Sequence, residues 1–131
     1  MKVLIQIVKE ANVKVDNKIV NQIENGYLLF VGIEITDTKE VIEKMAIKVA
    51  NIRINKDDEG KTNLSLKDVG GKILSISQFT LCADSTSRRP SFTKAANKEM
   101  AINYYEYFNK LLENEGYEVK TGCFGKHMDV S

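Results

Sequence analysis

Runs of apolar residues, alternating or continuous, divide the chain into short predicted strands. Residues 3–8 are mostly apolar, and the Asp16-Asn17 pair, a common turn sequence, separates two more apolar runs and predicts a hairpin. Residues 27–33 are apolar at successive positions, which indicates a central strand buried on both faces. Shorter strands are expected at 52–55, 63–66, 72–82, 117–121 and 128–131.

Two stretches carry apolar residues at helical spacing. Asp37 and Glu40 have the spacing of a capping box, so Asp37 is the expected N-cap of the first helix. Ser91 or Thr93 can cap the second helix, and Gly116 fits its C-terminal end. The apolar positions are Val41, Ile42, Met45, Ala46, Val49 and Ala50 in the first helix and Ala96, Met100, Ala101, Tyr104, Tyr105, Phe108, Leu111 and Leu112 in the second. Because the aromatic residues follow the spacing of a packed helix face, we interpret them as core.

This order of elements predicts one α/β domain over residues 1–131, a layered fold with a mixed sheet of about seven or eight strands and two main helices. Hydrophobic residues make up 43% of the chain and charged residues 28%, which is ordinary for a globular protein. A net charge of +1 excludes a strongly basic nucleic-acid coat and leaves only a local basic patch for RNA. We therefore expect no DNA partner.

The chain shows no signal for a membrane or for export. No apolar run approaches the ~20 residues that a membrane-spanning helix needs. The first residues, Met1-Lys2-Val3-Leu4-Ile5-Gln6, turn polar too early for a signal peptide. We expect a cytoplasmic protein with no membrane partner.

The predicted strand at 72–82 changes character at its end. Alternation places Leu74 and Ile76 on the same face as Gln78 and Thr80, so this face begins as core and then presents an amide and a hydroxyl roughly 7 Å apart. Such a strand is expected to leave the core and enter a pocket. The competing interpretation is a buried strand whose hydroxyls bond to neighbouring backbone.

Conventional catalytic groups are scarce. Cys82 and Cys123 are too few and too far apart for a zinc site or a disulfide framework, and we interpret both as small buried hydrophobes. A nucleophilic Cys82 has no evident base. His127, the sole histidine, is far along the chain from Ser77 and is interpreted as a surface or structural residue. The acidic turn at 56–61 is too short for a calcium loop, and we expect no metal or other cofactor.

Several motifs follow one another in a specific order: Asn63-Leu64-Ser65-Leu66, Gly70-Gly71, Ser77-Gln78-Phe79-Thr80-Leu81 and Arg88-Arg89-Pro90-Ser91-Phe92. In this order they resemble the D-aminoacyl-tRNA deacylase family, and the likeness runs from Lys2 to Ser131. The resemblance implies a layered α/β fold with a β-barrel-like core, a homodimer, and hydrolysis of the ester that joins a D-amino acid to tRNA, as chiral proofreading in translation. It also implies a second substrate, glycine mischarged onto tRNA-Ala.

This substrate would explain hydrolysis without a conventional base. An aminoacyl ester is activated, and the neighbouring ribose hydroxyl can position or activate water. We expect the backbone N–H groups near Phe79 and Thr80, with the Thr80 hydroxyl, to stabilise the oxyanion. Gln78 would orient the ester or the terminal adenosine, and Ser77 would hold the strand bend. Thr80 as a covalent nucleophile is less favoured, because nothing nearby deprotonates it.

The acceptor end of the tRNA is expected on the residues that follow. The expected substrate-binding residues are Leu81, Arg88, Arg89, Pro90, Ser91 and Phe92. The two arginines form the best local basic patch and would contact phosphates without reading sequence, with Lys94 and Lys98 on the next predicted helix. Phe92 can stack on the terminal adenine or staple the helix start. The alternative function is a module that binds the acceptor end without hydrolysis.

Two features depart from the family pattern. The family carries Asn-x-Gly-Pro-x-Thr near its C-terminus, which reaches into the partner subunit's site and excludes L-amino acids, whereas the only proline here is Pro90. We therefore expect that the sequence stops at Ser131 before that segment, which leaves a sheet edge unpaired. Ile7 stands where the family usually has arginine, and this removes a positive charge from the expected substrate contacts.

Overall fold

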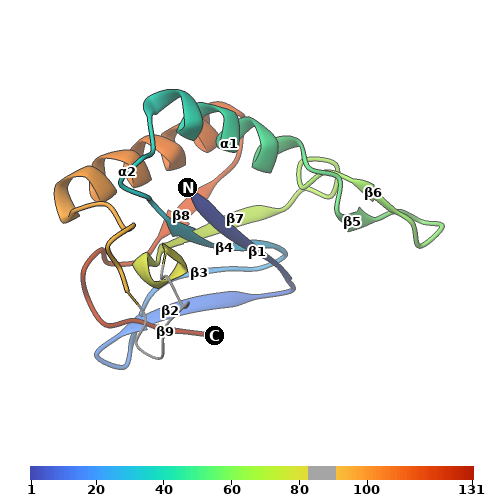
Figure 1. Cartoon of the computed structure of the whole chain (residues 1–131). Helices are drawn as coiled ribbons and strands as arrows, with labels where there is room; N and C mark the ends of the chain where they lie inside the picture. Colours follow the sequence, from blue (N-terminus) through green and yellow to red (C-terminus); the bar gives the residue numbers. More distant parts are fainter. Residues whose placement is uncertain (83–90) are drawn as a thin grey trace.

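The chain forms a mixed α/β structure in which two helices cover one face of a sheet (Figure 1). The computed structural model describes residues 1–82 and 91–131. The elements are, in chain order, β1 (Lys2–Val8), β2 (Ala11–Val15), β3 (Lys18–Ile23), β4 (Gly26–Gly32), α1 (Lys39–Asn51), β5 (Asn55–Lys56), β6 (Thr62–Leu64), β7 (Lys72–Ser77), the 3₁₀ helix η1 (Phe79–Cys82), α2 (Lys98–Asn114), β8 (Val119–Thr121) and β9 (Asp129–Val130). The predicted fold class is confirmed.

The main sheet has four strands in the order β1-β4-β7-β8. β4 pairs antiparallel with β1 and parallel with β7, and β7 in turn pairs parallel with β8. The central position of β4 confirms the prediction from its continuous apolar run. Because β4, β7 and β8 run in the same direction, their carboxyl ends meet at one edge of the sheet, where open α/β sheets bind ligands.

A second sheet, in the order β3-β2-β9, packs on the other face of the main sheet. Asp16 and Asn17 have φ angles of 52° and 63° and form the turn of the predicted β2–β3 hairpin. The strand predicted at 128–131 is present as β9, where Val130 pairs with Val13 at the edge of this sheet. The smaller core lies between the two sheets and includes Leu74 and Ile76 of β7.

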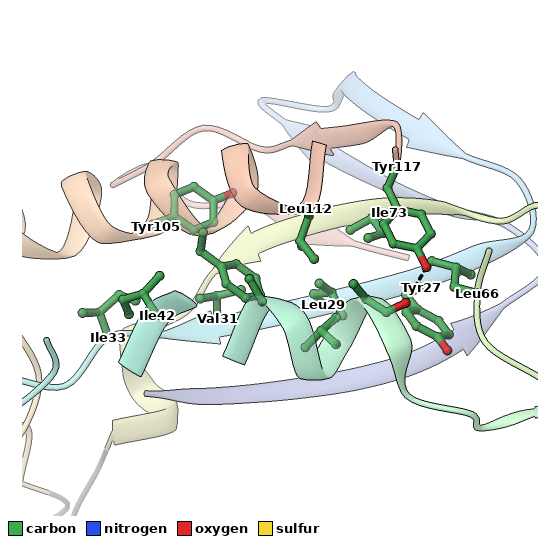
Figure 2. Close-up of a cluster of buried hydrophobic side chains, with 14 residues drawn as sticks. Tyr27, Leu29, Val31, Ile33, Ile42, Leu66, Ile73, Tyr105, Leu112 and Tyr117 are labelled. Atoms are coloured by element: carbon green, nitrogen blue, oxygen red, sulfur yellow. Dashed lines mark hydrogen bonds between the residues drawn. The ribbon is translucent and has the colours of Figure 1, made fainter. Parts of the chain in front are cut away.

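The larger core lies between the main sheet and the helices (Figure 2). Tyr27, Leu29 and Ile73 of the sheet and Leu112 of α2 are fully buried there. Alternate residues of β4 and β7 therefore face different cores, which is why β4 is apolar along its whole length and why Ile73 and Leu74 of β7 are both buried.

Two tyrosines hydrogen-bond across the larger core. The Tyr105 hydroxyl donates to the Ser75 carbonyl oxygen at 2.5 Å, and the Tyr117 hydroxyl donates to the Ala50 carbonyl oxygen at 2.5 Å. The aromatic face of α2 is thus core, as predicted. Neither α2 nor any other helix in residues 1–82 and 91–131 is long and apolar enough to cross a membrane.

The first helix begins one residue later than predicted. Thr38 is its N-cap, and its hydroxyl accepts from the Val41 N–H at 3.3 Å. Asp37 lies buried instead, where its carboxylate accepts from the Glu34 N–H at 2.7 Å and from the Met1 ammonium group at 2.5 Å. The prediction of Asp37 as N-cap was wrong because a distant ammonium group competes for this carboxylate.

The second helix begins with Asn97 as its N-cap, not with Ser91 or Thr93. The Asn97 side chain accepts from the Met100 N–H at 2.9 Å. The chain before it cannot be helical, because it bonds to the end of β4: the Ala96 N–H donates to the Ile33 carbonyl at 3.0 Å. Gly116, with a φ of 98°, ends α2 as predicted.

Candidate active site

A cavity of about 490 Å³ opens at the edge where the parallel strands end. Its wall includes Ser77 at the end of β7, followed by Gln78 and Phe79, and Ile33 just after β4. The remaining wall comes from the start of α2 and from the segment after β8, which Figure 1 shows in red passing from β8 towards β9. The complete lining is Ile33, Ile76, Ser77, Gln78, Phe79, Ala96, Ala101, Phe124, Gly125, Lys126, His127, Met128 and Val130.

β7 is shorter than predicted, because the strand ends at Ser77 and the chain then winds into η1. The Gln78 N–H still donates to the Val31 carbonyl at 2.8 Å. Beyond that point the ladder has no free acceptor, because the Ile33 carbonyl is already taken by the N–H of Ala96. The prediction that Gln78 and Thr80 share one face of a continuous strand was wrong. The pentapeptide at residues 77–81 instead forms a corner, where the chain leaves the strand and enters η1.

The polar side chains of the pentapeptide contact each other at this corner. Gln78 Nε2 donates to the Thr80 hydroxyl at 2.5 Å. Ser77, Gln78 and Phe79 line the cavity, whereas Thr80 and Leu81 do not. The Leu81 N–H donates to the Gln78 carbonyl at 3.3 Å and so stabilises the turn. The Gln78 amide therefore links the Thr80 hydroxyl to the cavity wall.

Two backbone donors at the same corner have no acceptor among the described residues. The N–H groups of Phe79 and Thr80 donate to no other residue in the part of the chain that the structure describes. They are the first N–H groups of η1, and such groups have no acceptor within their own helix. Adjacent unpaired N–H groups beside a cavity can stabilise a developing oxyanion.

Cys82 is packed beneath this corner and is not available as a nucleophile. It is 1% exposed, and burial raises the pKa of its thiol, so the thiol stays protonated. A Cβ added to Gly32 would lie only 3.0 Å from Cys82 Sγ, which shows how closely η1 approaches β4. The interpretation as a small buried hydrophobe is confirmed for Cys82, whereas Cys123 is only half-buried.

The segment after β8 contributes cavity residues that the sequence did not indicate. Lys126 and His127 line the same cavity as Ser77 and Gln78. The His127 side chain is 93% exposed, with Nε2 3.6 Å from Asp129 Oδ1, so its interpretation as a surface residue is confirmed but incomplete. The parallel pairing of β7 with β8 brings this segment to the cavity, and no local pattern reveals a parallel partner.

The expected tRNA contacts are described only in part. Arg88, Arg89 and Pro90 lie outside the described residues, and their roles stay predictions. Ser91 makes a local turn, with Oγ 3.2 Å from Thr93 Oγ1. Lys94 precedes α2, so its expected place on the helix was wrong.

Phe92 belongs to an aromatic wall. Its ring centroid lies 5.0 Å from that of Phe79 in an edge-on arrangement. Both rings line a second hollow of about 440 Å³, which also takes in Lys98, Phe124 and Gly125. Since α2 begins only at Lys98, Phe92 does not staple the helix start. Of the two roles predicted for Phe92, stacking on the terminal adenine stays a prediction.

The cavity holds few groups for proton transfer. No Asp or Glu is among its described lining residues, and His127 is its only histidine. Within residues 1–82 and 91–131, no three His, Cys, Asp or Glu side chains lie close enough to hold a metal ion. The polar side chains of the described lining are the Ser77 hydroxyl, the Gln78 amide and the basic groups of Lys126 and His127.

The fold and this site define a class: a small α/β protein with a largely apolar cavity at the carboxyl ends of parallel strands and, beside it, backbone N–H groups that bond to none of the described residues. Residues 4–131 match the family model described as D-Tyr-tRNA(Tyr) deacylase. The chain belongs to this family.

Relatives of known name support the assignment. The D-aminoacyl-tRNA deacylase of Lactobacillus acidophilus is 53% identical over 100% of this chain and 91% of its own length. That of an Exiguobacterium species is 51% identical over 100% of this chain and 90% of its own length.

Solved structures share the fold. A c-Myc DNA Unwinding Element Binding Protein is 34% identical, with a TM-score of 0.93 over 99% of this chain and 89% of that one. A structure described as a probable eukaryotic D-amino acid tRNA deacylase matches with a TM-score of 0.83 over 98% of this chain and 91% of that one. At 17% identity, this second likeness concerns the fold alone.

Proposed function

We propose that the chain hydrolyses the ester bond of D-aminoacyl-tRNA, releasing the D-amino acid and free tRNA as proofreading in translation. The observation that carries this proposal is the family match over residues 4–131, supported by relatives named D-aminoacyl-tRNA deacylase at about half identity. A cavity of about 490 Å³ is also within the usual size range of sites for small ligands.

The reaction requires little of the protein beyond orientation and charge stabilisation. Water adds to the ester carbonyl, the oxyanion forms, and collapse of the tetrahedral intermediate releases the carboxylic acid and the ribose hydroxyl. The N–H groups of Phe79 and Thr80 are the proposed oxyanion donors. Gln78 would hold the Thr80 hydroxyl and orient the ester, and Ser77 would hold the corner at the end of β7.

Deacylation of matched tRNA esters tests this function. We expect D-tyrosyl-tRNA to be cleaved far above its spontaneous rate. L-tyrosyl-tRNA is the comparison, and glycine on tRNA-Ala is a second substrate to assay. Thr80→Ala removes the hydroxyl and keeps the N–H, and we expect it to lower kcat ~100-fold. Thr80→Ser should keep most of the activity.

Thr93→Ala is the matched control, because Thr93 is exposed and lies outside the cavity lining. Full activity of Thr80→Ala would assign catalysis to the backbone donors alone. A D-ester that persists at its spontaneous rate with the unaltered protein would overturn the proposed function.

The alternative, an acceptor-end binding module without hydrolysis, rests on the lack of a carboxylate in the described cavity lining. It is less well supported, because the relatives are named for deacylation. It predicts tRNA binding that survives Thr80→Ala, with no turnover in either form.

We also propose that the protein acts as a homodimer. β1 lies at an edge of the main sheet, and its Leu4 and Ile7 are 48% and 54% exposed. A second copy would cover this apolar strand edge. Sedimentation equilibrium should give the mass of a dimer, and Leu4→Lys should shift it towards the monomer. A monomeric unaltered protein would contradict the proposal.

A cytoplasmic location and the lack of a DNA partner stay predictions. One solved relative is named for binding a DNA unwinding element, so DNA binding calls for a direct test. Because the net charge is only +1, we expect duplex DNA not to compete with aminoacyl-tRNA at physiological salt.

A further inference from the structure

We infer that Lys98, Lys126 and His127 form a basic rim at the cavity mouth and that this rim binds the phosphate on the 5′ side of the terminal adenosine of tRNA. This inference rests on the proposed function, because it assigns a subsite to the same substrate. The pentapeptide motif at residues 77–81 does not predict a role for any of the three residues. The rim is assembled from two distant segments, the start of α2 and the turn after β8.

The positions of the three side chains support one rim. Lys126 and His127 line the cavity together with Ser77 and Gln78. Lys98 lines the neighbouring hollow, which shares Phe79, Ala96, Ala101, Phe124 and Gly125 with the cavity. A Cβ added to Gly125 would lie 3.9 Å from Lys98 Cε, so the Lys98 stem lies against the turn that carries the other two residues.

Gly125 forms the turn that carries Lys126 and His127. Its φ of 77° is in the left-handed region, and the Lys126 N–H donates to the Cys123 carbonyl at 3.3 Å to close the turn. The chain reverses at this point and presents Lys126 and His127 in succession at the cavity.

The exposure of the side chains places the rim at the mouth of the cavity and not in its interior. Lys98 and Lys126 are exposed, and the His127 side chain is 93% exposed. The lining below them is largely apolar, with Ile33 and Ile76 among its members. An apolar cavity with a hydrated cationic mouth fits a ligand that has a planar or apolar part and an anionic part, which describes a nucleotide.

The charges near the rim leave the lysines available. Neither Lys98 nor Lys126 forms an ion pair with another residue in the ranges that the structure describes. Asp129 lies beside His127, with its Oδ1 3.6 Å from Nε2, and Glu99 follows Lys98 on α2. The exposed imidazole of His127 keeps a ring N–H that can donate to a phosphate oxygen.

The chemistry of the substrate selects phosphate as the partner. The amino acid carboxyl group is esterified, and its α-ammonium group is positive, so the rim repels the aminoacyl end. The anions of the substrate that remain are the phosphates of the acceptor strand. The rim therefore sets the direction of binding, with the phosphate outside and the ester within. A general-base role for His127 fits less well, because its side chain is 93% exposed at the mouth, whereas such a base must lie within hydrogen-bond reach of the attacking water.

Two D-tyrosyl esters that share the terminal adenosine, one with the acceptor-strand phosphates and one without any phosphate, test the rim. One is D-tyrosyl-tRNA, and the other is the D-tyrosyl ester of adenosine, which carries no phosphate. For Lys98→Ala/Lys126→Ala we expect KM for the tRNA ester to rise about ten-fold while kcat changes less than two-fold, with a shallower dependence of kcat/KM on salt. Cleavage of the adenosine ester should not change. Lys110→Ala, another exposed lysine of α2, is the matched control.

A binding measurement tests whether the rim binds phosphate, and it does not depend on turnover. By calorimetry we expect adenosine 5′-phosphate to bind the unaltered protein more tightly than adenosine, and the double variant to lose this difference. His127→Ala should lose part of it, and His127→Gln, which keeps a donor, should restore it. Equal affinity of adenosine and adenosine 5′-phosphate for the unaltered protein would overturn the rim, as would equal losses of kcat/KM for the two esters in the double variant. Failure of the proposed function is distinct, because the unaltered protein would then cleave neither ester.

Discussion

Gly32 shows how a single residue controls the geometry of the site. A Cβ at this position would lie 3.0 Å from both Leu81 Cβ and Cys82 Sγ and 3.1 Å from the Gln78 carbonyl oxygen. All three neighbours belong to the corner that carries the proposed oxyanion donors. The corner must therefore move by a few tenths of an ångström to admit a methyl group.

Gly32→Ala should lower kcat/KM for the D-ester by about ten-fold, because small displacements of catalytic groups reduce rate steeply. Overpacking should also cost about 1 kcal/mol of stability, measured by urea unfolding. Gly60→Ala is the control, since Gly60 has a positive φ but no atom within 4 Å of an added Cβ. It should cost stability without affecting activity, and a fully active Gly32→Ala would contradict the argument.

At the residue scale, sequence patterns identified the cavity residues Ser77, Gln78 and Phe79 but not the contacts that decide their surroundings. Asp37 has the spacing of an N-cap, yet its carboxylate is buried against the Met1 ammonium group, far away in sequence. His127 was interpreted as a surface residue because a lone histidine carries no pattern. Such contacts depend on the fold as a whole, so local spacing cannot reveal them.

At the scale of elements, the start of α2 can be tested directly. Asn97→Ala should lower the free energy of unfolding by about 1 kcal/mol, because it removes the acceptor for the Met100 N–H. Urea unfolding followed by circular dichroism measures the change. Ser91→Ala and Thr93→Ala, which alter the two predicted caps, should have smaller effects. A larger loss from either of them would place the helix start where the sequence pattern put it.

The existence of elements was easier to predict than their pairing. Both helices, the β2–β3 hairpin and the central β4 were expected from periodicity and turn residues, and all are present. β7 was expected to continue to residue 82 because alternation persists in the sequence, but its neighbour no longer offers a hydrogen-bond acceptor there. The parallel pairing of β7 with β8, which brings Lys126 to the cavity, has no local signature.

For the whole molecule, alkaline pH should be destabilising. Burial raises the pKa of Tyr105, and burial likewise raises the pKa of Tyr117. Both hydroxyls donate hydrogen bonds in the fold, so the folded state retains protons that the unfolded state releases. The free energy of unfolding is therefore expected to fall as pH rises above about 10, the ordinary tyrosine pKa.

Urea unfolding at a series of pH values from neutral to alkaline measures this dependence. Lysine deprotonation contributes in the same range, so the comparison with Tyr105→Phe isolates the phenol. That variant should be less stable at neutral pH but lose less with each step of pH. An identical slope in the two proteins would contradict the assignment.

The two cores share β4 and β7, whose alternate side chains belong to one or the other. Neither layer can separate from β7 without the other being disturbed, so the molecule should unfold as one cooperative unit. Amide protons of β7 should then exchange with solvent only when the whole chain opens, while those of the β5–β6 hairpin, which projects from the body in Figure 1, exchange through local fraying. Because the first of the proposed oxyanion donors lies only two residues after the end of β7, a solvent or temperature that loosens the donors is expected to unfold the protein as well.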